Sequence, residues 1–238
     1  MIPFGLAALM TVSLPIARRA TKCLVPGASA IYLCNEGAGT TLRDYSGNAR
    51  DGTLGAAAAA PTWGPTGLTF DGGDKAVLTS ANFATAFASA LSVTAVVNPT
   101  GTTTGGIVEI GRAVGALTLV LRVVSNRGYL YVQDHSTTLT TAAGALPGST
   151  WTDFTATHVW GGAAVAYVDG AQNAASSIAS TYTAPGTNTS AIGDYAGFAF
   201  TGGIAAILLY PFVLTPTQVA QNHAALKAML APRGIALA

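Results

Sequence analysis

The chain has 238 residues, and 11 Lys or Arg against 10 Asp or Glu leave a formal net charge of +1. This balance disfavours a basic nucleic-acid-binding protein and an acidic tail protein, so we expect no nucleic-acid partner. Only 9% of the residues are charged and 50% are hydrophobic, whereas a typical soluble domain has about 25% charged residues. We therefore expect the chain to hide part of its surface against other protein subunits. Because no apolar run reaches about 18 residues, we expect no membrane span.

The chain contains 28 Gly and 11 Pro, which favours turn-rich β-structure. Its length fits one all-β domain with extensions. The two cysteines, Cys23 and Cys34, exclude a disulfide-stapled scaffold and a four-thiolate zinc site built from this chain alone. They form one disulfide or remain two free thiols, and free thiols would belong in or near a core.

The first 17 residues are almost wholly apolar and are followed by Arg18 and Arg19. A secretory signal peptide has its basic residues before the apolar stretch, so this order argues against one. We interpret residues 1–26 as a docking arm that packs on its own domain or on another subunit. A signal peptide and a membrane-associating segment are the alternatives. The predicted docking residues are Ile2, Phe4, Leu6, Leu9, Met10, Leu14, Arg18 and Arg19.

Residues 31–212 consist of short apolar runs separated by glycine-rich turns, with no sustained helical period. This pattern excludes a doubly wound α/β fold and favours a sandwich or jelly roll. Residues 125–128 (SNRG), residues 160–162 (WGG) and Asp169-Gly170 predict tight turns, because Asn, Asp and Gly tolerate positive φ. The predicted strands are residues 91–97, 106–110, 117–124, 128–133, 151–159, 163–168 and 203–210.

A C-terminal helix is predicted over residues 216–230. Thr215 is the N-cap candidate, Pro216 stands at the first helical position, and Gln218 completes a capping box. Apolar residues recur at helical spacing behind this start. We expect the helix to plug an end or edge of a sheet, with His223 as a surface or hydrogen-bonded residue rather than a ligand.

Four segments carry a family resemblance, and they occur in the family's order along the chain. The first reads YLCNEGAGTTLRDYSGNARDGTL, and the segments are residues 32–54, 63–77, 154–171 and 192–214. Together they resemble laminin-G-like, concanavalin A-like jelly-roll domains. The resemblance implies an all-β, two-sheet antiparallel jelly-roll sandwich over residues 27–214, with the N-terminal arm before it and a helix and tail over residues 215–238.

Two turns in these segments are rich in oxygen-bearing side chains. Residues 44–48 (DYSGN) and 71–74 (DGGD) combine short polar side chains with glycine, which suits tight turns capped by their own side chains. Similar domains carry a structural Ca²⁺ near these loops, and Ca²⁺ prefers six to eight oxygen ligands. The resemblance therefore implies Asp44, Asn48 and Asp71 as possible calcium ligands. The alternative is a set of capped turns without metal.

Catalytic chemistry finds little support in the sequence. Glycoside hydrolases need two carboxylates about 5 to 10 Å apart, and the only glutamates, Glu36 and Glu109, lie outside any alternating acidic strand motif. The three histidines are His135, His158 and His223, and the G-x-S-x-G motif of serine hydrolases is missing. We therefore predict no catalytic residues and no enzymatic activity.

Two non-enzymatic function classes fit the sequence. We expect a non-enzymatic structural protein on a virion surface, as a capsid decoration or tail-associated protein anchored by its arm, because such chains resemble phage surface proteins in size and arm. The alternative is a carbohydrate-binding module or adhesin that is secreted or displayed on a cell and recognises cell-surface glycans. A sugar could stack on a tryptophan, but core packing is the favoured role of Trp63, Trp151 and Trp160.

Overall fold

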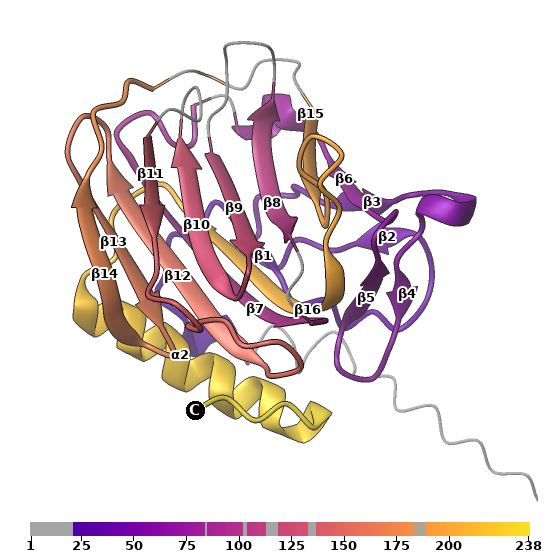
Figure 1. The fold of residues 1–238 in the computed structure, drawn as a ribbon. Coiled ribbons are helices and arrows are strands. Elements are labelled where there is room, and N and C mark those ends of the chain that lie inside the picture. The colour runs from indigo at the N-terminus through magenta and orange to yellow at the C-terminus, as the bar shows by residue number, and fades with distance from the viewer. Residues whose placement is uncertain are drawn as a thin grey trace, which may run out of the picture.

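A computed structural model describes residues 21–83, 85–101, 104–112, 119–132, 137–182, 184 and 189–238. All of the predicted docking residues, from Ile2 to Arg19, lie outside these ranges, as does His135. Two β-sheets lie one in front of the other, and the one α-helix among the described residues runs along the lower edge of the view in Figure 1. The predicted all-β, two-sheet sandwich with a C-terminal helix is confirmed.

The rear sheet, sheet A, consists of β1 (Ala30–Tyr32), β4 (Thr62–Trp63), β5 (Leu68–Asp71), β7 (Ala90–Pro99), β12 (Thr152–Val159), β13 (Ala163–Val168), β14 (Ala171–Ser177) and β16 (Thr201–Tyr210). Its strand order is β14-β13-β12-β7-β16-β5-β4, and β1 also pairs with β16. The long strands β7 and β16 therefore form its centre, and the polar strand β14 forms an edge.

The front sheet, sheet B, consists of β2 (Thr41–Leu42), β3 (Gly52–Leu54), β6 (Ala76–Leu78), β8 (Thr104–Arg112), β9 (Leu119–Val124), β10 (Arg127–Val132), β11 (Thr137–Thr140) and β15 (Thr189–Ile192). Its order is β11-β10-β9-β8-β15-β6-β3-β2. Each of the seven predicted strands is present, although residues 117, 118 and 133 lie outside the described part of the chain.

The predicted hairpin turns are also confirmed. Val124 pairs with Arg127, so Ser125 and Asn126 alone connect β9 to β10. Their φ angles are 49° and 62°, and two successive residues at positive φ give the turn whose twist matches a hairpin. The turn after β13 is built in the same way, with Asp169 at 47° and Gly170 at 76°.

The main core lies between the sheets and follows the alternation of the strands. In β9, Leu119, Leu121 and Val123 face this core, whereas Val120 and Arg122 face outward. Successive side chains of a strand point to opposite faces of the sheet. When one set of alternate residues is buried in the core, the other set therefore lies on the outer face. Sheet B thus presents a defined set of residues on its outer face.

The outer face of sheet A is closed by the C-terminal helix α2 (Pro216–Leu230). The capping box is present, because Thr215 Oγ1 accepts from the Gln218 amide at 3.3 Å and Gln218 Oε1 accepts from the Thr215 amide at 2.9 Å. The helix packs on the central strands β7 and β16, through a second buried cluster that includes Val96, Leu208, Val219 and Leu226. It therefore covers the outer face of sheet A and also contacts the edge strand β14. The prediction that it plugs an end or edge of a sheet did not include this coverage of the central strands.

The described part of the predicted arm packs on its own domain. It begins with the 3-10 turn η1 (Thr21–Cys23). Leu24 and Val25 are buried in the cluster under α2, and the Val25 amide donates to Asn222 Oδ1 at 2.8 Å. Both cysteines are free, Cys23 exposed and Cys34 buried.

Three further 3-10 turns complete the described helices, and they are η2 (Ala57–Ala59), η3 (Ser80–Phe83) and η4 (Ala231–Arg233). Among the helices that the structure describes, none has the length and apolarity needed to cross a membrane.

Candidate functional site

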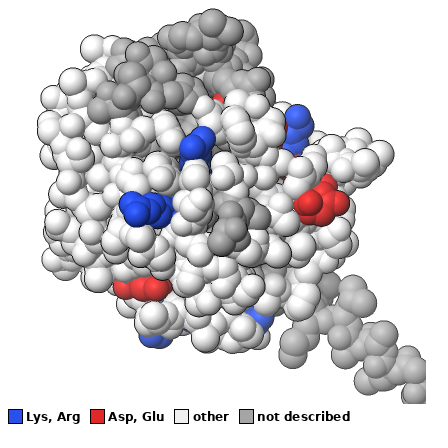
Figure 2. Space-filling view, viewed as in Figure 1, with Lys and Arg blue, Asp and Glu red and all other residues white. Residues whose placement is uncertain are grey.

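The outer face of sheet B carries a group of aromatic side chains around one arginine. Because α2 closes the outer face of sheet A, the face of β8–β11 is the broad sheet surface that no described helix covers. Figure 2 shows few charged side chains on this side of the molecule. We name the group the arginine–tyrosine cluster, and its members are Arg122, Tyr129, Tyr131, Tyr195 and Phe198.

Strand register brings the first three members together. Arg122 of β9 stands opposite Tyr129 of β10, and Tyr131 stands opposite Val120. Directly opposed residues of an antiparallel pair have Cβ atoms about 4.5–5.5 Å apart. The rings of Tyr129 and Tyr131 stack with centroids 5.9 Å apart, although the residues are two positions apart on the same strand. The outer stripe of two neighbouring strands thus forms one continuous aromatic surface.

The guanidinium of Arg122 lies among three tyrosine rings. Its Cζ is 4.6 Å from the Tyr131 centroid, 5.6 Å from Tyr129 and 5.8 Å from Tyr195. A guanidinium within about 6 Å of an aromatic centroid is attracted by the ring's π face. Burial raises the pKa of the Tyr131 hydroxyl, so this ring stays neutral near pH 7. The Arg122 Nε atom is buried and has no hydrogen-bond partner among the described residues.

Tyr195 reaches this surface from the loop between β15 and β16. The loop crosses β8 at Gly106, where an added Cβ would stand 2.3 Å from Tyr195 Cβ, so glycine is required for this approach. A tight turn fixes the loop, because the Phe198 amide donates to Tyr195 O at 2.7 Å and the Gly106 amide donates to Phe198 O at 2.8 Å. The Tyr195 and Phe198 rings stack at 6.0 Å, and Phe198 is 50% exposed.

This arrangement is suited to binding a flat ligand. Aromatic faces offer apolar area to a flat ligand surface at a small cost in side-chain entropy. The arginine adds charged hydrogen-bond donors in a fixed planar fork. The sequence gives one visible signal for it, the alternation Tyr129-x-Tyr131 in a predicted strand. The sequence patterns did not predict the cluster itself, because Arg122 and Tyr195 join it through strand register and a loop crossing.

Asp44, a predicted calcium ligand, has its carboxylate occupied by the protein. Its Oδ1 accepts from the amides of Ile31 at 2.9 Å and Ser46 at 2.8 Å. Its Oδ2 accepts from Ser46 Oγ at 2.8 Å and from the Arg50 amide at 3.0 Å. A carboxylate has about four lone-pair positions, so these donors leave none for a cation. Asp44 fastens its loop to β1 instead.

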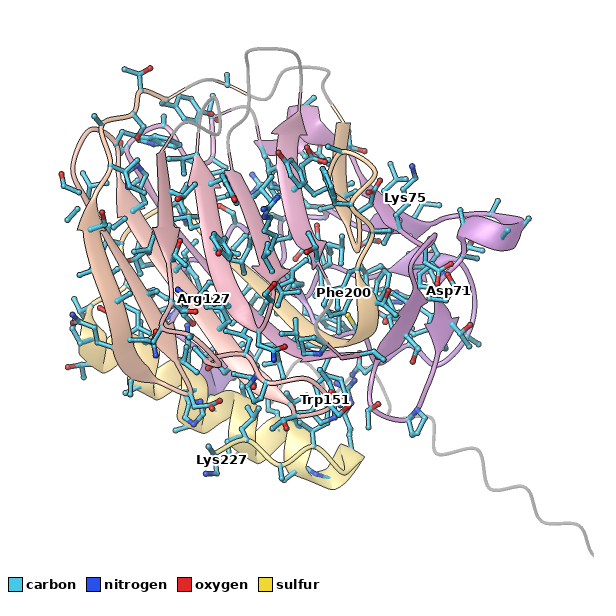
Figure 3. The ribbon with its side chains drawn as sticks, in the orientation of Figure 1. Asp71, Lys75, Arg127, Trp151, Phe200 and Lys227 are labelled. Atoms are coloured by element: carbon cyan, nitrogen blue, oxygen red, sulfur yellow. The ribbon has the colours of Figure 1, made fainter. Side chains whose placement is uncertain are left out.

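The other two predicted ligands are also engaged, and they do not join Asp44. Asn48 Nδ2 donates to Ala28 O at 3.0 Å and to Ser29 O at 3.1 Å. Asp71 ends β5 in sheet A, where its Oδ1 caps the Gly73 amide at 3.1 Å; Figure 3 labels it. No group of three His, Cys, Asp or Glu side chains that could hold a metal occurs in the described ranges. These residues do not fit the calcium ion that the resemblance implies.

A pocket of about 530 Å³ opens beside the Asp44 loop. Its lining residues are Thr21, Lys22, Arg43, Asp44, Tyr45, Ser46, Gly47, Ala49 and Asp51. Because its central carboxylate is saturated by protein donors, the pocket offers less ligand chemistry than the arginine–tyrosine cluster. It also borders Thr21, the point where residues 1–20 join the described chain.

The two described histidines have structural partners. Nε2 of the buried His158 lies 2.8 Å from Ser180 Oγ, and burial lowers its pKa. His223 Nδ1 lies 3.2 Å from Oδ2 of Asp153, a residue that is 1% exposed. The hydrogen bond to Asp153 raises the pKa of His223, while burial raises the pKa of Asp153. The prediction that His223 is a hydrogen-bonded residue is therefore confirmed.

The two glutamates lie on separate elements. Glu36 Oε1 accepts from the Arg43 amide at 2.9 Å in the loop after β1, and Glu109 lies in β8. The three tryptophans pack against the two large apolar clusters, Trp63 and Trp160 on the main core and Trp151 on the cluster under α2. Core packing of the tryptophans is confirmed.

Comparisons with known proteins agree with this fold. No curated protein matches the chain in sequence. The binding domain of botulinum neurotoxin serotype G is similar in structure, with a TM-score of 0.64 and 13% identity over 83% of this chain and 51% of that one. Domain 4 of an extracellular arabinanase from Geobacillus stearothermophilus, in complex with arabinotriose, has a TM-score of 0.61 and 18% identity over 83% of this chain and 98% of that domain.

A sialidase from Trypanosoma rangeli matches with a TM-score of 0.61 and 18% identity over 84% of this chain and 33% of its own. The chain spans about half the length of the neurotoxin binding domains. At these identities the likeness establishes the fold alone. A family model also matches residues 70–220. This chain belongs to the concanavalin A-like lectin/glucanases superfamily.

Proposed function

We propose that this domain binds carbohydrate on the outer face of sheet B, through the arginine–tyrosine cluster. The observation that carries the proposal is a preformed set of stacked aromatic rings around a guanidinium, on the sheet face that α2 leaves open. Sugar rings have flat apolar faces and polar edges, so aromatic side chains and planar donors complement them. The arabinotriose complex of the similar arabinanase domain supports this ligand class.

Presentation on a virion surface stays a prediction. It rests on the low charge of the chain and on the apolar segment at residues 1–17. Particle association of the full chain, compared with a version lacking residues 1–26, tests it. Binding to capsids or tails that disappears with the arm would support the placement, and equal behaviour of both versions would refute it. The prediction that the protein is not an enzyme is likewise open to direct assay against glycan substrates.

A glycan array with matched variants tests carbohydrate binding. Tyr129→Ala and Phe198→Ala each remove one ring of the cluster, and we expect each to weaken binding about ten-fold, which corresponds to about 1.4 kcal/mol. Val77→Ala is the control, because Val77 is 44% exposed on β6 of the same sheet, away from the cluster. Thermal melting establishes that all variants fold. Equal binding by wild type and both aromatic variants, or loss with Val77→Ala alone, would contradict the assignment of the site.

A further inference from the structure

We propose that the saccharide bound by this face carries a carboxylate, so that the arginine–tyrosine cluster selects acidic over neutral sugars. This inference rests on the proposed carbohydrate function and narrows its ligand class. Its basis is a pair of arginines on the outer stripes of β9 and β10, where the described residues provide no anionic partner for either of them.

The strand register makes Arg122 and Arg127 diagonal neighbours on the outer face of β9 and β10. Arg127 stands opposite Val124, two positions from Arg122 on β9. Such diagonal neighbours in an antiparallel pair are about 7–8 Å apart, and long side chains cover that span. Arg127, labelled in Figure 3, is partly exposed on the front sheet beside the turn that joins the two strands. Two positive charges therefore border the tyrosine surface.

Neither arginine has an ion-pair or hydrogen-bond partner among the described residues. Arg122 contacts rings there, and its buried Nε–H has no acceptor in the same part of the chain. Leaving a buried charged donor unsatisfied costs free energy in the absence of ligand. A bound anion that accepts from the outward N–H groups of this guanidinium would stabilise its charge at the surface. The charge of Arg122, with no anionic partner in the described part of the chain, thus favours an acceptor that arrives from outside.

The acidic residue nearest the two arginines on this sheet is Glu109, which stands opposite Val120 on β8 and has a side chain that is 1% exposed. In the described part of the chain no ion pair joins it to Arg122 or Arg127. The surface offered to a ligand therefore combines positive charge with aromatic rings.

A carboxylate fits these donors better than a neutral hydroxyl. Stacking on tyrosine uses the π face of the guanidinium and leaves its N–H groups in the plane. A carboxylate accepts two parallel hydrogen bonds from that plane, and charged hydrogen bonds are roughly twice as strong as neutral ones. The chain's net charge of +1 argues against a polyanion such as nucleic acid as the ligand.

The test compares each acidic saccharide with its neutral counterpart. Suitable probes are sialyllactose against lactose and oligogalacturonate against the same oligomer with its carboxyl groups reduced, which distinguishes sialic acid from uronic acid as the source of the carboxylate. We expect wild type to bind at least one acidic probe ten-fold or more tightly than its neutral partner. Raising the salt from about 0.1 M to about 1 M should reduce this preference, because the partly exposed charges are then screened.

Three variants locate the preference. Arg122→Lys keeps the charge but loses the planar fork, and Arg127→Ala removes the second charge without removing a ring contact. We expect each to reduce the preference for the acidic probe, by about ten-fold for Arg122→Lys, while binding of the neutral probe changes less than about two-fold. Arg43→Ala is the matched control, because this arginine is exposed and lies in the separate pocket beside Asp44.

Three results would overturn the inference, and they separate it from the proposed function. Equal binding of acidic and neutral probes refutes the carboxylate and leaves carbohydrate binding standing. Failure to bind any saccharide refutes both. An acidic preference that survives Arg122→Lys and Arg127→Ala but falls with Arg43→Ala would place the anion site in the other pocket and refute this one.

Discussion

Replacing Arg233 with alanine should greatly lower the free energy of unfolding, although the residue lies near the C-terminus. Arg233 ends η4, and its guanidinium donates to four main-chain carbonyls. The acceptors are Leu33 at 2.8 Å, Cys34 at 3.1 Å, Ala205 at 3.4 Å and Thr66. One side chain therefore joins the C-terminal segment to the residues after β1, to the turn before β5 and to β16.

The magnitude follows from these bonds. A hydrogen bond to a charged group contributes about 1.5–3 kcal/mol net, and the bonds to Leu33 and Cys34 have ordinary lengths. Counting these two gives a loss of about 3 kcal/mol for Arg233→Ala. Burial lowers the pKa of Arg233 from its usual value, but the side chain remains charged at neutral pH. For a chain of this size, about 3 kcal/mol corresponds to a fall in Tm of about 6–12 °C.

Urea unfolding followed by tryptophan fluorescence measures the effect. Arg43→Ala is the control, because it makes the same substitution at an exposed side chain, and we expect it to change stability by less than about 0.5 kcal/mol. The stability of Arg233→Lys should lie between those of wild type and Arg233→Ala, because a single ammonium group cannot replace all the donors of the planar guanidinium. If Arg233→Ala unfolds within about 0.5 kcal/mol of wild type, the four contacts do not hold these segments together.

Three other perturbations test separate contacts. The hydrogen bond to Asp153 raises the pKa of His223. The stabilisation from protonated His223 is therefore complete below about pH 6.5 and is lost as the pH rises through the raised pKa of the folded state. Between about pH 6 and about pH 9 the Tm of wild type should fall, and the Tm of His223→Ala should fall less. Gly106→Ala should lower Tm and abolish glycan binding, because the new Cβ would stand 2.3 Å from Tyr195 Cβ; unchanged binding would show that the loop can shift. Asp44→Ala should cost about 3 kcal/mol in chemical unfolding, whereas EDTA should leave the wild-type Tm unchanged; a fall in Tm with EDTA would restore the calcium interpretation.

The regular part of the fold was predictable because its signals are local. Alternation marked the long strands, and the Asn126 and Asp169 turns carried residues suited to positive φ. The capping box placed the start of the helix at Pro216, where the structure has it. The short strands β1 to β6, β11 and β15 and the polar edge strand β14 were not among the predicted strands. In β14 the reason is plain, because AQNAASS has neither an apolar stripe nor bulky β-forming residues.

The candidate site was less predictable because its members come from distant positions. The aromatic pair Tyr129 and Tyr131 shares one strand, but Arg122 joins it by register and Tyr195 by the crossing at Gly106. For Asp44 the sequence suggested a site that the structure does not support. Its surroundings in sequence suit a cation ligand, yet the backbone amides that help to saturate its carboxylate become visible only in the folded loop.

An irregularity in β16 lies directly under the helix that covers the outer face of sheet A. A register shift between Ile204 and Ala206 turns two successive residues, Ala205 and Ala206, to the outer face of sheet A, while Ile204 and Ile207 face the main core. The two small side chains let the apolar cluster under α2 pack closely on the sheet.

With this face closed by the chain itself, the outer face of sheet B is the broad sheet surface left for a ligand among the described residues. The arginine–tyrosine cluster lies on that surface. A charged substitution such as Ala206→Asp should therefore destabilise the domain by detaching α2, while the Arg122 surface keeps its geometry. Hydrogen exchange on such a variant should rise in α2 and stay low in β9 and β10. Equal exposure of both sheets would contradict this division of roles.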